Sequence, residues 1–294
     1  MNLQRADARM KRDSPAAEAR LHLPQTRRRK AEFSMDKEAR IIALIAQAGR
    51  AMVEFEKDFD VIEKGGSQNY VTTVDLRVQR MIAQALEEIC PEGILIAEED
   101  GLGKARTAPC FFVLDPIDGT SNLMHGMKHS AISLSMHEAG RYALAIVYDP
   151  YLEEMFVANR KGAFLNGVPI HVSSRPLADA LIGFGTNPYD RTRSHENFAA
   201  LEALFYHCHE IRRSGSAALD LAYVACGRLD GMFEQNLQAW DFSAGRFLVE
   251  QAGGRVTDYA LNSPDPTCET SLIASNGLIH EQMHGLIIGG RNGN

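Results

Sequence analysis

The sequence contains a single tryptophan among its 294 residues, and aromatic residues make up only 7% of it. Its five cysteines are scattered without a C-x-x-C pair: Cys90, Cys110, Cys208, Cys226 and Cys268. An odd and dispersed set of cysteines indicates neither a disulfide framework nor a zinc knuckle, and it fits a reducing cytoplasm. The sequence has no apolar run of about 18 residues and no apolar core of a secretory signal, so we expect a cytoplasmic protein without membrane segments.

The overall composition is that of a folded protein, with 45% hydrophobic and 23% charged residues. These values exclude wholesale disorder and collagen-like structure. A chain of this length forms one large domain or two packed lobes. No repeat period is visible. We therefore expect two lobes that can form a crevice between them.

The charge is distributed unevenly along the chain. The net charge is -7, yet residues 1–34 carry nine Lys or Arg against four Asp or Glu, which leaves -12 on residues 35–294. An acidic body repels a nucleic-acid backbone at long range, so nucleic acid is an unlikely main partner. Such a body is better suited to binding cations.

Residues 1–34 lack a sustained apolar rhythm and contain the basic run Arg27, Arg28, Arg29 and Lys30. This pattern predicts a mobile basic arm. Three alternatives stay open: a targeting segment, an arm that contacts nucleic acid, and translation that starts at Met35.

The apolar periodicity predicts an α/β protein. Helical spacing begins at Met35 and continues to Phe55, and a second helix follows near Asp75. Between them, the glycine-containing segment 64–69 is a candidate lid. We expect strands at 93–97, 111–114, 132–137, 142–148, 154–158 and 163–165, and helices near 194–207, 216–227 and 241–252. The second and third pairs of strands each form a hairpin, and the lobe boundary falls near residue 178.

The strongest local signal is a pair of carboxylates three residues apart that directly follows an apolar strand, in the segment Asp115-Pro116-Ile117-Asp118-Gly119-Thr120-Ser121-Asn122. A plain turn is one interpretation, because Asp, Pro and Gly all favour turns. Two carboxylates and the Ile117 carbonyl also form a partial oxygen shell for Mg²⁺. The backbone N–H groups of Gly119 and Thr120 then offer a cradle for an anion.

Two further acidic sites favour the metal interpretation. Glu98 follows the strand at 93–97, and Asp241 opens an apolar helix, where it also fits an N-cap. If these side chains converge with Asp115 and Asp118, each pair repels by roughly 4 kcal/mol at about 4 Å, so a bare cluster is unfavourable. Bound cations resolve this conflict and can activate water for phosphoester hydrolysis.

With these acidic motifs, the sequence resembles the inositol monophosphatase family, a group of Mg²⁺-dependent, lithium-sensitive sugar phosphatases. The resemblance runs from about Met35 to the C-terminus. It rests on five ordered motifs: Lys64 with Val71-Thr72-Thr73-Val74-Asp75, then Ala97-Glu98-Glu99, then the segment from Asp115 to Asn122, then Gly215-Ser216-Ala217-Ala218, and last Trp240-Asp241-Phe242-Ser243-Ala244-Gly245.

The resemblance implies specific roles for these residues. It implies Mg²⁺ ligation by Glu98, Asp115, the Ile117 carbonyl, Asp118 and Asp241. It implies that Thr120 and Asp75, assisted by Glu98, orient and deprotonate the attacking water, and that the Gly119 and Thr120 amides hold the phosphate. It further implies that Asp118, Ser216, Ala217 and Glu234 meet the substrate, and that Lys64 belongs to the mobile loop.

The resemblance also implies a layered αβαβα sandwich, in which an N-terminal α+β lobe and a C-terminal α/β lobe meet at the metal site. With the boundaries read from the sequence pattern, the expected parts are a mobile arm at 1–34, the α+β lobe at 35–178 and the α/β lobe at 179–294. The implied activity is hydrolysis of inositol monophosphate by a homodimer. Histidinol phosphate, fructose 1,6-bisphosphate or a nucleotide 3'-phosphate are alternative substrates, although Glu234 favours a polyol. A regulatory or binding module built on the phosphatase fold is an alternative class.

Three positions depart from the family pattern. Asn69 stands where an Asp is frequent, Ser121 replaces a common Thr, and Phe111-Phe112-Val113-Leu114 replaces a strand that usually contains Trp. Other candidate motifs are weaker. His207 and His209 have a spacing that fits zinc but are expected at the end of a surface helix, and segment 101–104 lacks the spacing of a nucleotide-binding glycine loop. No nucleophile elbow is present, so covalent catalysis has no support.

Overall fold

The structure is a computed structural model that describes residues 25–63, 70–99, 108–188 and 190–292. Backbone contacts divide the chain into residues 1–36 and residues 37–294. Helix α1 (Gln25–Phe55) begins in the first unit. The predicted helix start at Met35 is therefore wrong by ten residues. The rest of the predicted arm, residues 1–24, lies outside the described residues, as do the predicted lid at 64–69 and segment 101–104.

The second unit, residues 37–294, contains two large sheets, of which the first has seven strands in the order β3-β4-β5-β6-β7-β8-β9. Its strands are β3 (Ile94–Ala97), β4 (Cys110–Asp118), β5 (Ala131–Glu138), β6 (Arg141–Asp149), β7 (Glu154–Asn159), β8 (Gly162–Leu165) and β9 (Val168–Pro169). β3 and β4 run parallel, and all other neighbours are antiparallel. The two predicted hairpins are confirmed as β5–β6 and β7–β8.

The second sheet has five strands in the order β11-β10-β12-β14-β13. Its strands are β10 (Leu181–Phe184), β11 (Glu210–Arg212), β12 (Gly231–Leu237), β13 (Arg255–Asp258) and β14 (Thr270–Ser275). β10 is parallel to both of its neighbours, while β14 is antiparallel to both of its own. The predicted lobe boundary at residue 178 falls in the short helix η2 (Leu177–Asp179), which lies between the two sheets in sequence.

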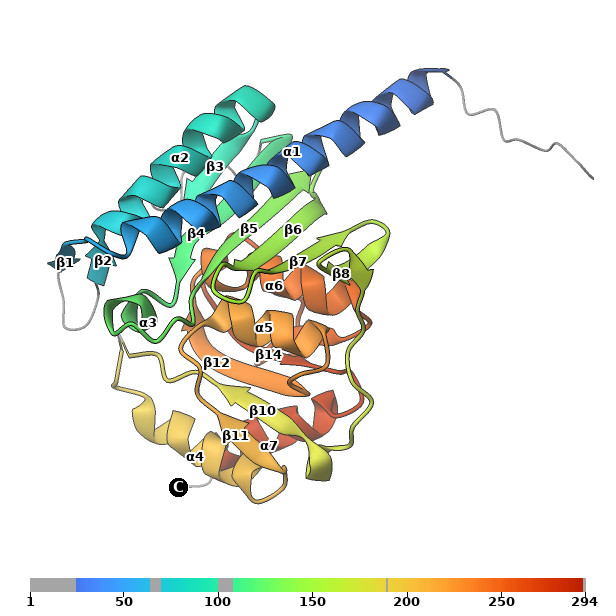
Figure 1. The fold of residues 1–294 in the computed structure, drawn as a ribbon. Coiled ribbons are helices and arrows are strands. Elements are labelled where there is room, and N and C mark those ends of the chain that lie inside the picture. The colour runs from blue at the N-terminus through green and yellow to red at the C-terminus, as the bar shows by residue number, and fades with distance from the viewer. Residues whose placement is uncertain (1–24, 64–69, 100–107, 189, 293–294) are drawn as a thin grey trace, which may run out of the picture. The chain divides into compact units, whose positions relative to one another are not determined.

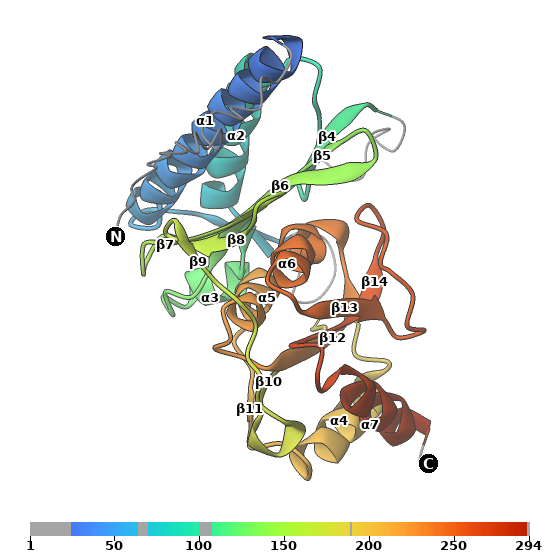
Figure 2. The same ribbon diagram turned by 90° about the vertical axis from the view of Figure 1, so that its right-hand side faces the viewer.

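Helices cover both sheets and separate them. The helices after α1 are α2 (Thr73–Ile89), α3 (Thr120–Met124), α4 (Ser194–Phe205), α5 (Ala217–Ala225), α6 (Ala239–Gln251) and α7 (His280–Asn292), and a small hairpin pairs β1 (Val61–Glu63) with β2 (Tyr70–Thr72). Within the second unit, α2 and the later part of α1 lie on one face of the seven-stranded sheet, and α5 and α6 lie on the other (Figure 1). Figure 2 shows the five-stranded sheet beyond α5 and α6, with α4 and α7 outside it. The predicted αβαβα sandwich is confirmed.

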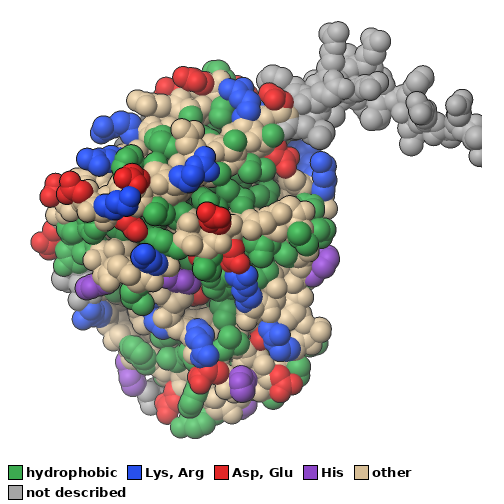
Figure 3. Space-filling model, in the orientation of Figure 1, with side chains coloured by type: hydrophobic (Ala, Val, Ile, Leu, Met, Phe, Trp, Pro, Cys, Tyr) green, Lys and Arg blue, Asp and Glu red, His purple; other side chains and the backbone are tan. Residues whose placement is uncertain are grey.

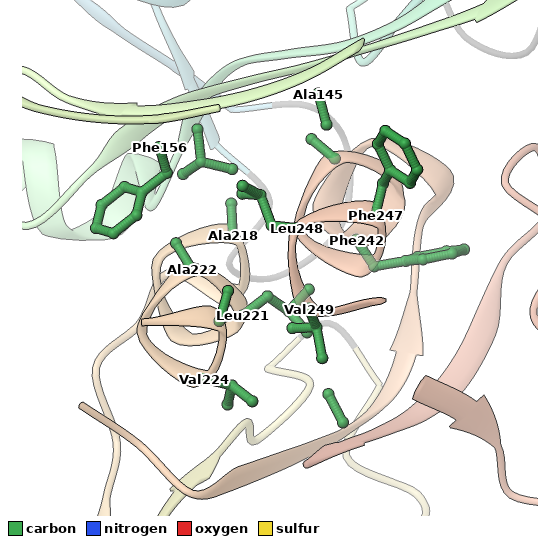
Figure 4. Close-up of a cluster of buried hydrophobic side chains, with 14 of the residues drawn as sticks. Ala145, Phe156, Ala218, Leu221, Ala222, Val224, Phe242, Phe247, Leu248 and Val249 are labelled. Atoms are coloured by element: carbon green, nitrogen blue, oxygen red, sulfur yellow. The ribbon is translucent and has the colours of Figure 1, made fainter. Parts of the chain in front are cut away.

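Each interface between layers is a separate apolar cluster. Residues of α1 that recur at helical spacing, Ile41, Ile45 and Met52, are fully buried against α2 and the larger sheet. Between the sheets, apolar side chains of β6, β7, α5 and α6 meet, among them Phe156 and Phe242 (Figure 4). The buried apolar area drives this layering, because the outer helices bury one face, while both sheets and the helices between them, α5 and α6, are covered on two sides.

The surface seen in Figure 3 carries mixed charges over this unit. Lys and Arg side chains alternate with Asp and Glu side chains on the visible face. In the described parts of the chain, no helix combines the length and the apolar character needed to cross a bilayer.

The acidic motif at 115–118 is not the turn that the sequence suggests. β4 continues through Asp118, with all of its residues buried. The register with β5 shifts between Asp115 and Asp118, so the strand accommodates Pro116 as an irregularity instead of ending. As a result, both carboxylates belong to a buried strand and not to an exposed turn.

Candidate metal and phosphate site

One pocket of about 310 Å³ contains nearly all the residues that the sequence singles out. The site residues that line it are Glu98, Asp115, Ile117, Asp118, Gly119, Thr120, Ser216, Ala217, Glu234 and Asp241. Asp75 does not line the pocket but contacts it through Thr120. Lys64 and Asn69 lie outside the described residues. Elements from both sheets thus build a single site.

The end of β4 supplies the first two carboxylates. Asp115 is 2% exposed, and its Oδ1 accepts a hydrogen bond of 2.9 Å from the Ile117 N–H. Asp118 Oδ2 accepts hydrogen bonds from the Ala218 N–H at 2.8 Å and from the Ser216 hydroxyl. The N-terminus of α5 therefore fixes one oxygen of Asp118.

Helix α6 supplies the third carboxylate. Asp241 stands at the third position of the helix, and its Oδ2 accepts a hydrogen bond of 2.7 Å from the Gln238 N–H. The expectation that Asp241 is the N-cap is wrong, because Gln238 occupies that position in a reciprocal capping box. The carboxylate remains at the positive end of the helix dipole.

Side chains of β5 hold the start of α6 in place. Ser133 Oγ donates to the Trp240 carbonyl at 3.3 Å, and Ser243 Oγ lies 2.8 Å from Ser135 Oγ. His137 Nε2 lies 3.3 Å from the same Ser243 Oγ. Because the three serines and His137 are buried, the network fixes the helix start relative to the larger sheet.

Asp115, Asp118 and Asp241 form an acidic cluster in which one carboxylate oxygen from each lies within 4.8 Å of the others. Burial is the main reason why the pKa of Asp115 and that of Asp241 lie well above the ordinary range. The nearby Glu98 carboxylate adds to the rise at both. Burial also raises the pKa of Asp118 to about 6. Packing like charges together without water is unfavourable, and a hard cation relieves it.

Glu98 reaches this cluster from the end of β3. It directly follows Ala97, the last residue of the strand, and its N–H donates to the Leu114 carbonyl at 3.2 Å. Because β3 and β4 are parallel, their C-terminal ends lie at the same edge of the sheet. The topology therefore brings together Glu98 and Asp115, as the sequence suggests.

Thr120 and Asp75 form a hydrogen-bonded pair beside the cluster. Thr120 Oγ1 lies 3.1 Å from Asp75 Oδ1 and 3.1 Å from the Ile117 carbonyl oxygen. The other oxygen of Asp75 accepts from the N–H and the hydroxyl of Thr72, which caps α2. Asp75 is fully buried, and burial raises its pKa. This carboxylate is held rigidly with one oxygen directed at Thr120.

Gly119 has a backbone conformation that only glycine adopts without strain. Its φ of +94° lies in the left-handed region, and it precedes α3. A Cβ here would lie 3.0 Å from the His129 carbonyl oxygen and 3.3 Å from that of Gly215. Asn122 secures the same region, since its Nδ2 donates to the His129 and Ser214 carbonyls at 2.7 and 3.0 Å.

The wall opposite β4 contains the residues predicted to meet the substrate alcohol. Ser216 caps α5, and Ala217 is the first residue of that helix. Glu234 lies on β12, and its carboxyl group packs directly against Gly185. A Cβ added to Gly185 would lie 1.8 Å from the Glu234 carboxyl carbon, so only glycine leaves room for this carboxylate. Burial raises the pKa of Glu234 to about 7, although the Arg213 guanidinium opposes the rise.

The sequence analysis missed several residues that line the pocket, among them Asn187, Arg213 and Asp220. Burial raises the pKa of Asp220 to about 8. A carboxylate inside the apolar run of residues 217–225 was a usable signal, because charged residues are rarely buried without a function or a partner. Arg213 donates through Nε and Nη2 to Thr186 Oγ1 at 3.3 and 3.2 Å.

The weaker sequence candidates lie elsewhere. His207 and His209 are exposed after the end of α4, and His207 Nδ1 lies 2.8 Å from the Ala203 carbonyl oxygen. Of the residues that depart from the family pattern, Ser121 does line the pocket. The strand that departs from the family pattern, residues 111–114, is buried.

Comparison with known proteins agrees with this geometry. A sequence model of the inositol monophosphatase family matches residues 34–292, and the chain belongs to that family. The protein named Nus factor SuhB of Xylella fastidiosa is 41% identical over 202 residues, which are 68% of this chain and 72% of that protein.

Two solved structures are similar in fold. A Thermotoga maritima IMPase has a TM-score of 0.78 and 32% identity, and the alignment covers 86% of this chain and 96% of that one. An IMPase/NADP phosphatase complexed with Mg²⁺ and phosphate has a TM-score of 0.75 and 26% identity, with 82% and 90% covered.

Proposed function

We propose that this chain is a Mg²⁺-dependent phosphomonoesterase that hydrolyses inositol monophosphate to inositol and phosphate. The observation that carries the proposal is the convergence of three carboxylates, two of them buried and the third partly buried, beside the Thr120–Asp75 pair in one pocket. Hard oxygen donors of this kind suit Mg²⁺. The similar structure that binds Mg²⁺ and phosphate supports the choice of ion and of reaction class.

The donor set fits the proposed ion. Glu98, Asp115, Asp118, Asp241 and the Ile117 carbonyl would hold it, since all of them line the same pocket. When bound, Mg²⁺ supplies the positive charge that offsets these carboxylates and stabilises the charge on the reacting phosphoryl group. The buried carboxylates with raised pKa values are the feature of this chain that such a charge would compensate.

Thr120 and Asp75 would move the proton of the attacking water. Thr120 Oγ1 can donate to Asp75 Oδ1 while its own lone pair accepts a hydrogen bond from water. Because burial raises the pKa of Asp75, this carboxylate is a better proton acceptor than an exposed one. Glu98, which lines the same pocket, would assist.

Backbone and side-chain groups would orient the substrate. The N–H groups of Gly119 and Thr120, at the start of α3, would hold the phosphate. Ser216, Ala217 and Glu234 would face the departing alcohol, and the Glu234 carboxylate would accept hydrogen bonds from the hydroxyls of a polyol. The reaction would be a direct displacement by water without a covalent intermediate.

Other phosphate esters use the same chemistry. Histidinol phosphate, fructose 1,6-bisphosphate and a nucleotide 3'-phosphate are the alternative substrates, and the name of the IMPase/NADP phosphatase favours a nucleotide phosphate among them. A binding function for this fold is the second candidate, because the similar Xylella protein carries the name of a Nus factor.

Phosphate release by the purified protein tests these proposals. We expect turnover of inositol 1-phosphate that requires Mg²⁺, disappears with EDTA and exceeds turnover of the three alternative esters. A preference for another ester would retain the chemistry and overturn the substrate. Absence of turnover on all four esters with saturating Mg²⁺ would contradict the phosphatase proposal and favour the binding function.

Replacing Glu234 with glutamine tests the role of this carboxylate in specificity. The substitution keeps the shape but removes the charge that accepts polyol hydroxyls, so we expect KM for inositol 1-phosphate to rise about tenfold. KM for fructose 1,6-bisphosphate is expected to change far less. Steady-state kinetics on both esters check this, and equal losses on both would refute a specificity role.

A further inference from the structure

Two buried cysteines lie in contact outside the pocket. Cys90 and Cys110 are 1% and 5% exposed, and their Sγ atoms are 3.6 Å apart. Twenty residues separate them in sequence. A disulfide bond requires a sulfur separation of about 2.05 Å, so a shift of roughly 1.5 Å would bring the two atoms to bonding distance.

A buried lysine lies beside this thiol pair. Lys37 Nζ is 3.8 Å from Cys90 Sγ and 2.8 Å from Glu138 Oε1. The Lys37 side chain is 11% exposed, and Glu92 lies 3.8 Å from the same ammonium group. A positive charge next to a sulfur atom stabilises the thiolate, which is the reactive form of cysteine.

The pair lies just below the surface. The residues that follow Cys90 and precede Cys110 in sequence, Pro91 and Pro109, are both exposed. Burial raises the pKa of both thiols, that of Cys110 to about 12, and Lys37 opposes the rise at each. Because the two sulfur atoms are this buried, a small oxidant reaches them more readily than a large disulfide reagent.

We propose that Cys90 and Cys110 are an oxidation site at which a small hydroperoxide forms an internal disulfide. The Cys90 thiolate attacks the peroxide, forming a sulfenic acid and releasing hydroxide. The Cys110 sulfur then displaces the sulfenic oxygen, which leaves as water once it has taken up a proton. In total, the two thiols lose two protons and two electrons, and one hydrogen peroxide becomes two waters.

The position of the pair gives the bond a structural effect. Cys90 caps the end of α2, whose first turn carries Asp75, and Cys110 begins β4, which carries Asp115. The disulfide would link the C-terminal end of α2 to the N-terminal end of β4. The opposite ends of these two elements are already connected, because Thr120, which follows β4, contacts Asp75 in the first turn of α2. Closing a loop of this length stabilises the folded chain by restricting the unfolded one.

Treating the full chain with hydrogen peroxide tests this proposal. We expect intact mass to show the loss of two hydrogen atoms, and a non-reducing digest to yield one linked peptide that contains both cysteines and separates with dithiothreitol. We also expect the midpoint of thermal unfolding to rise by about 5 °C. Conversion of either cysteine to sulfinic acid without a linked peptide would overturn the proposal.

Three variants separate this bond from other oxidation. Cys110→Ala and Cys90→Ala are each expected to lose the linked peptide and the rise in unfolding midpoint, whereas the matched control Cys226→Ala keeps both. A rise of the same size in Cys110→Ala would refute the assignment. Should either variant fail to fold, the linked peptide of the wild-type chain still decides the question. Phosphatase activity enters none of these readouts, so the result is independent of the proposed function.

Discussion

Replacing Asp115 with asparagine is expected to lower kcat on inositol 1-phosphate by about 10³-fold while the protein stays folded. Asp115 is buried, and its carboxylate is one of three that converge. An amide retains an oxygen for the Ile117 N–H, so the local hydrogen bond survives. If Asp115 is a ligand as proposed, the amide removes one charged donor, and with it most of the expected affinity for a divalent cation.

Two measurements check this expectation. Calorimetric titration should show that Mg²⁺ binding is lost in the variant, and thermal unfolding in EDTA should show a midpoint no lower than that of the wild type. Asp149→Asn is the matched control, since Asp149 is equally buried but lies on β6, which is separated from β4 by β5, and does not line the pocket. It should keep Mg²⁺ binding. An Asp115→Asn variant with normal turnover would contradict the ligand assignment.

Replacing Phe242 with alanine is expected to lower the free energy of unfolding by about 3–5 kcal/mol. Phe242 follows Asp241 and is fully buried between the two large sheets. The smaller side chain leaves a cavity that the packed helices α5 and α6 cannot fill. Urea unfolding followed by circular dichroism measures the change.

Phe205→Ala is the matched control for this prediction. Phe205 ends α4 and is 54% exposed, so the same substitution there should change the free energy of unfolding by no more than about 0.5 kcal/mol. Equal effects at the two positions would show that burial between the sheets is not what stabilises the start of α6.

The sequence predicts most of the fold because its elements have a clear apolar periodicity. The error at the start of α1 has a physical cause. Residues 25–34 lack that periodicity, yet Arg, Lys, Ala and Glu in this stretch are strong helix formers. Apolar spacing reports where a helix packs, and propensity extends a helix beyond that region.

The irregular end of β4 depends on partners far away in sequence. Pro116 and Gly119 favour a turn locally, but pairing with β5 continues the strand to Asp118. In the same way, Gln238 takes the cap of α6 because Asp241 accepts its N–H from within the helix. In both cases the local sequence indicates that a strand ends or a helix begins nearby. The tertiary contacts decide the exact residue, which differs from the local expectation by up to three positions.

The candidate site was likewise predicted in part from local motifs and in part not, because some of its residues depend on tertiary packing. The ordered motifs predict a set of carboxylates, and the described structure brings all of these carboxylates into the pocket or into contact with a residue that lines it. Lys64, from the same motifs, lies outside the described residues. Asp220 could have been found from the sequence, because it is a carboxylate inside the apolar run of residues 217–225. Asn187 and Arg213 were missed because they follow β10 and β11 and belong to the pocket only through the packing of these strands. No local pattern encodes that packing.

The contact between Asp118 and the start of α5 has a consequence for synthesis. One oxygen of Asp118 depends on residues 216 and 218, and the third carboxylate of the cluster is residue 241. A chain emerging from the ribosome therefore lacks a complete site until more than four fifths of it has been made. Contacts so distant in sequence form slowly, so the acidic cluster is among the last features to assemble. A cation that binds there favours the finished chain over every shorter one.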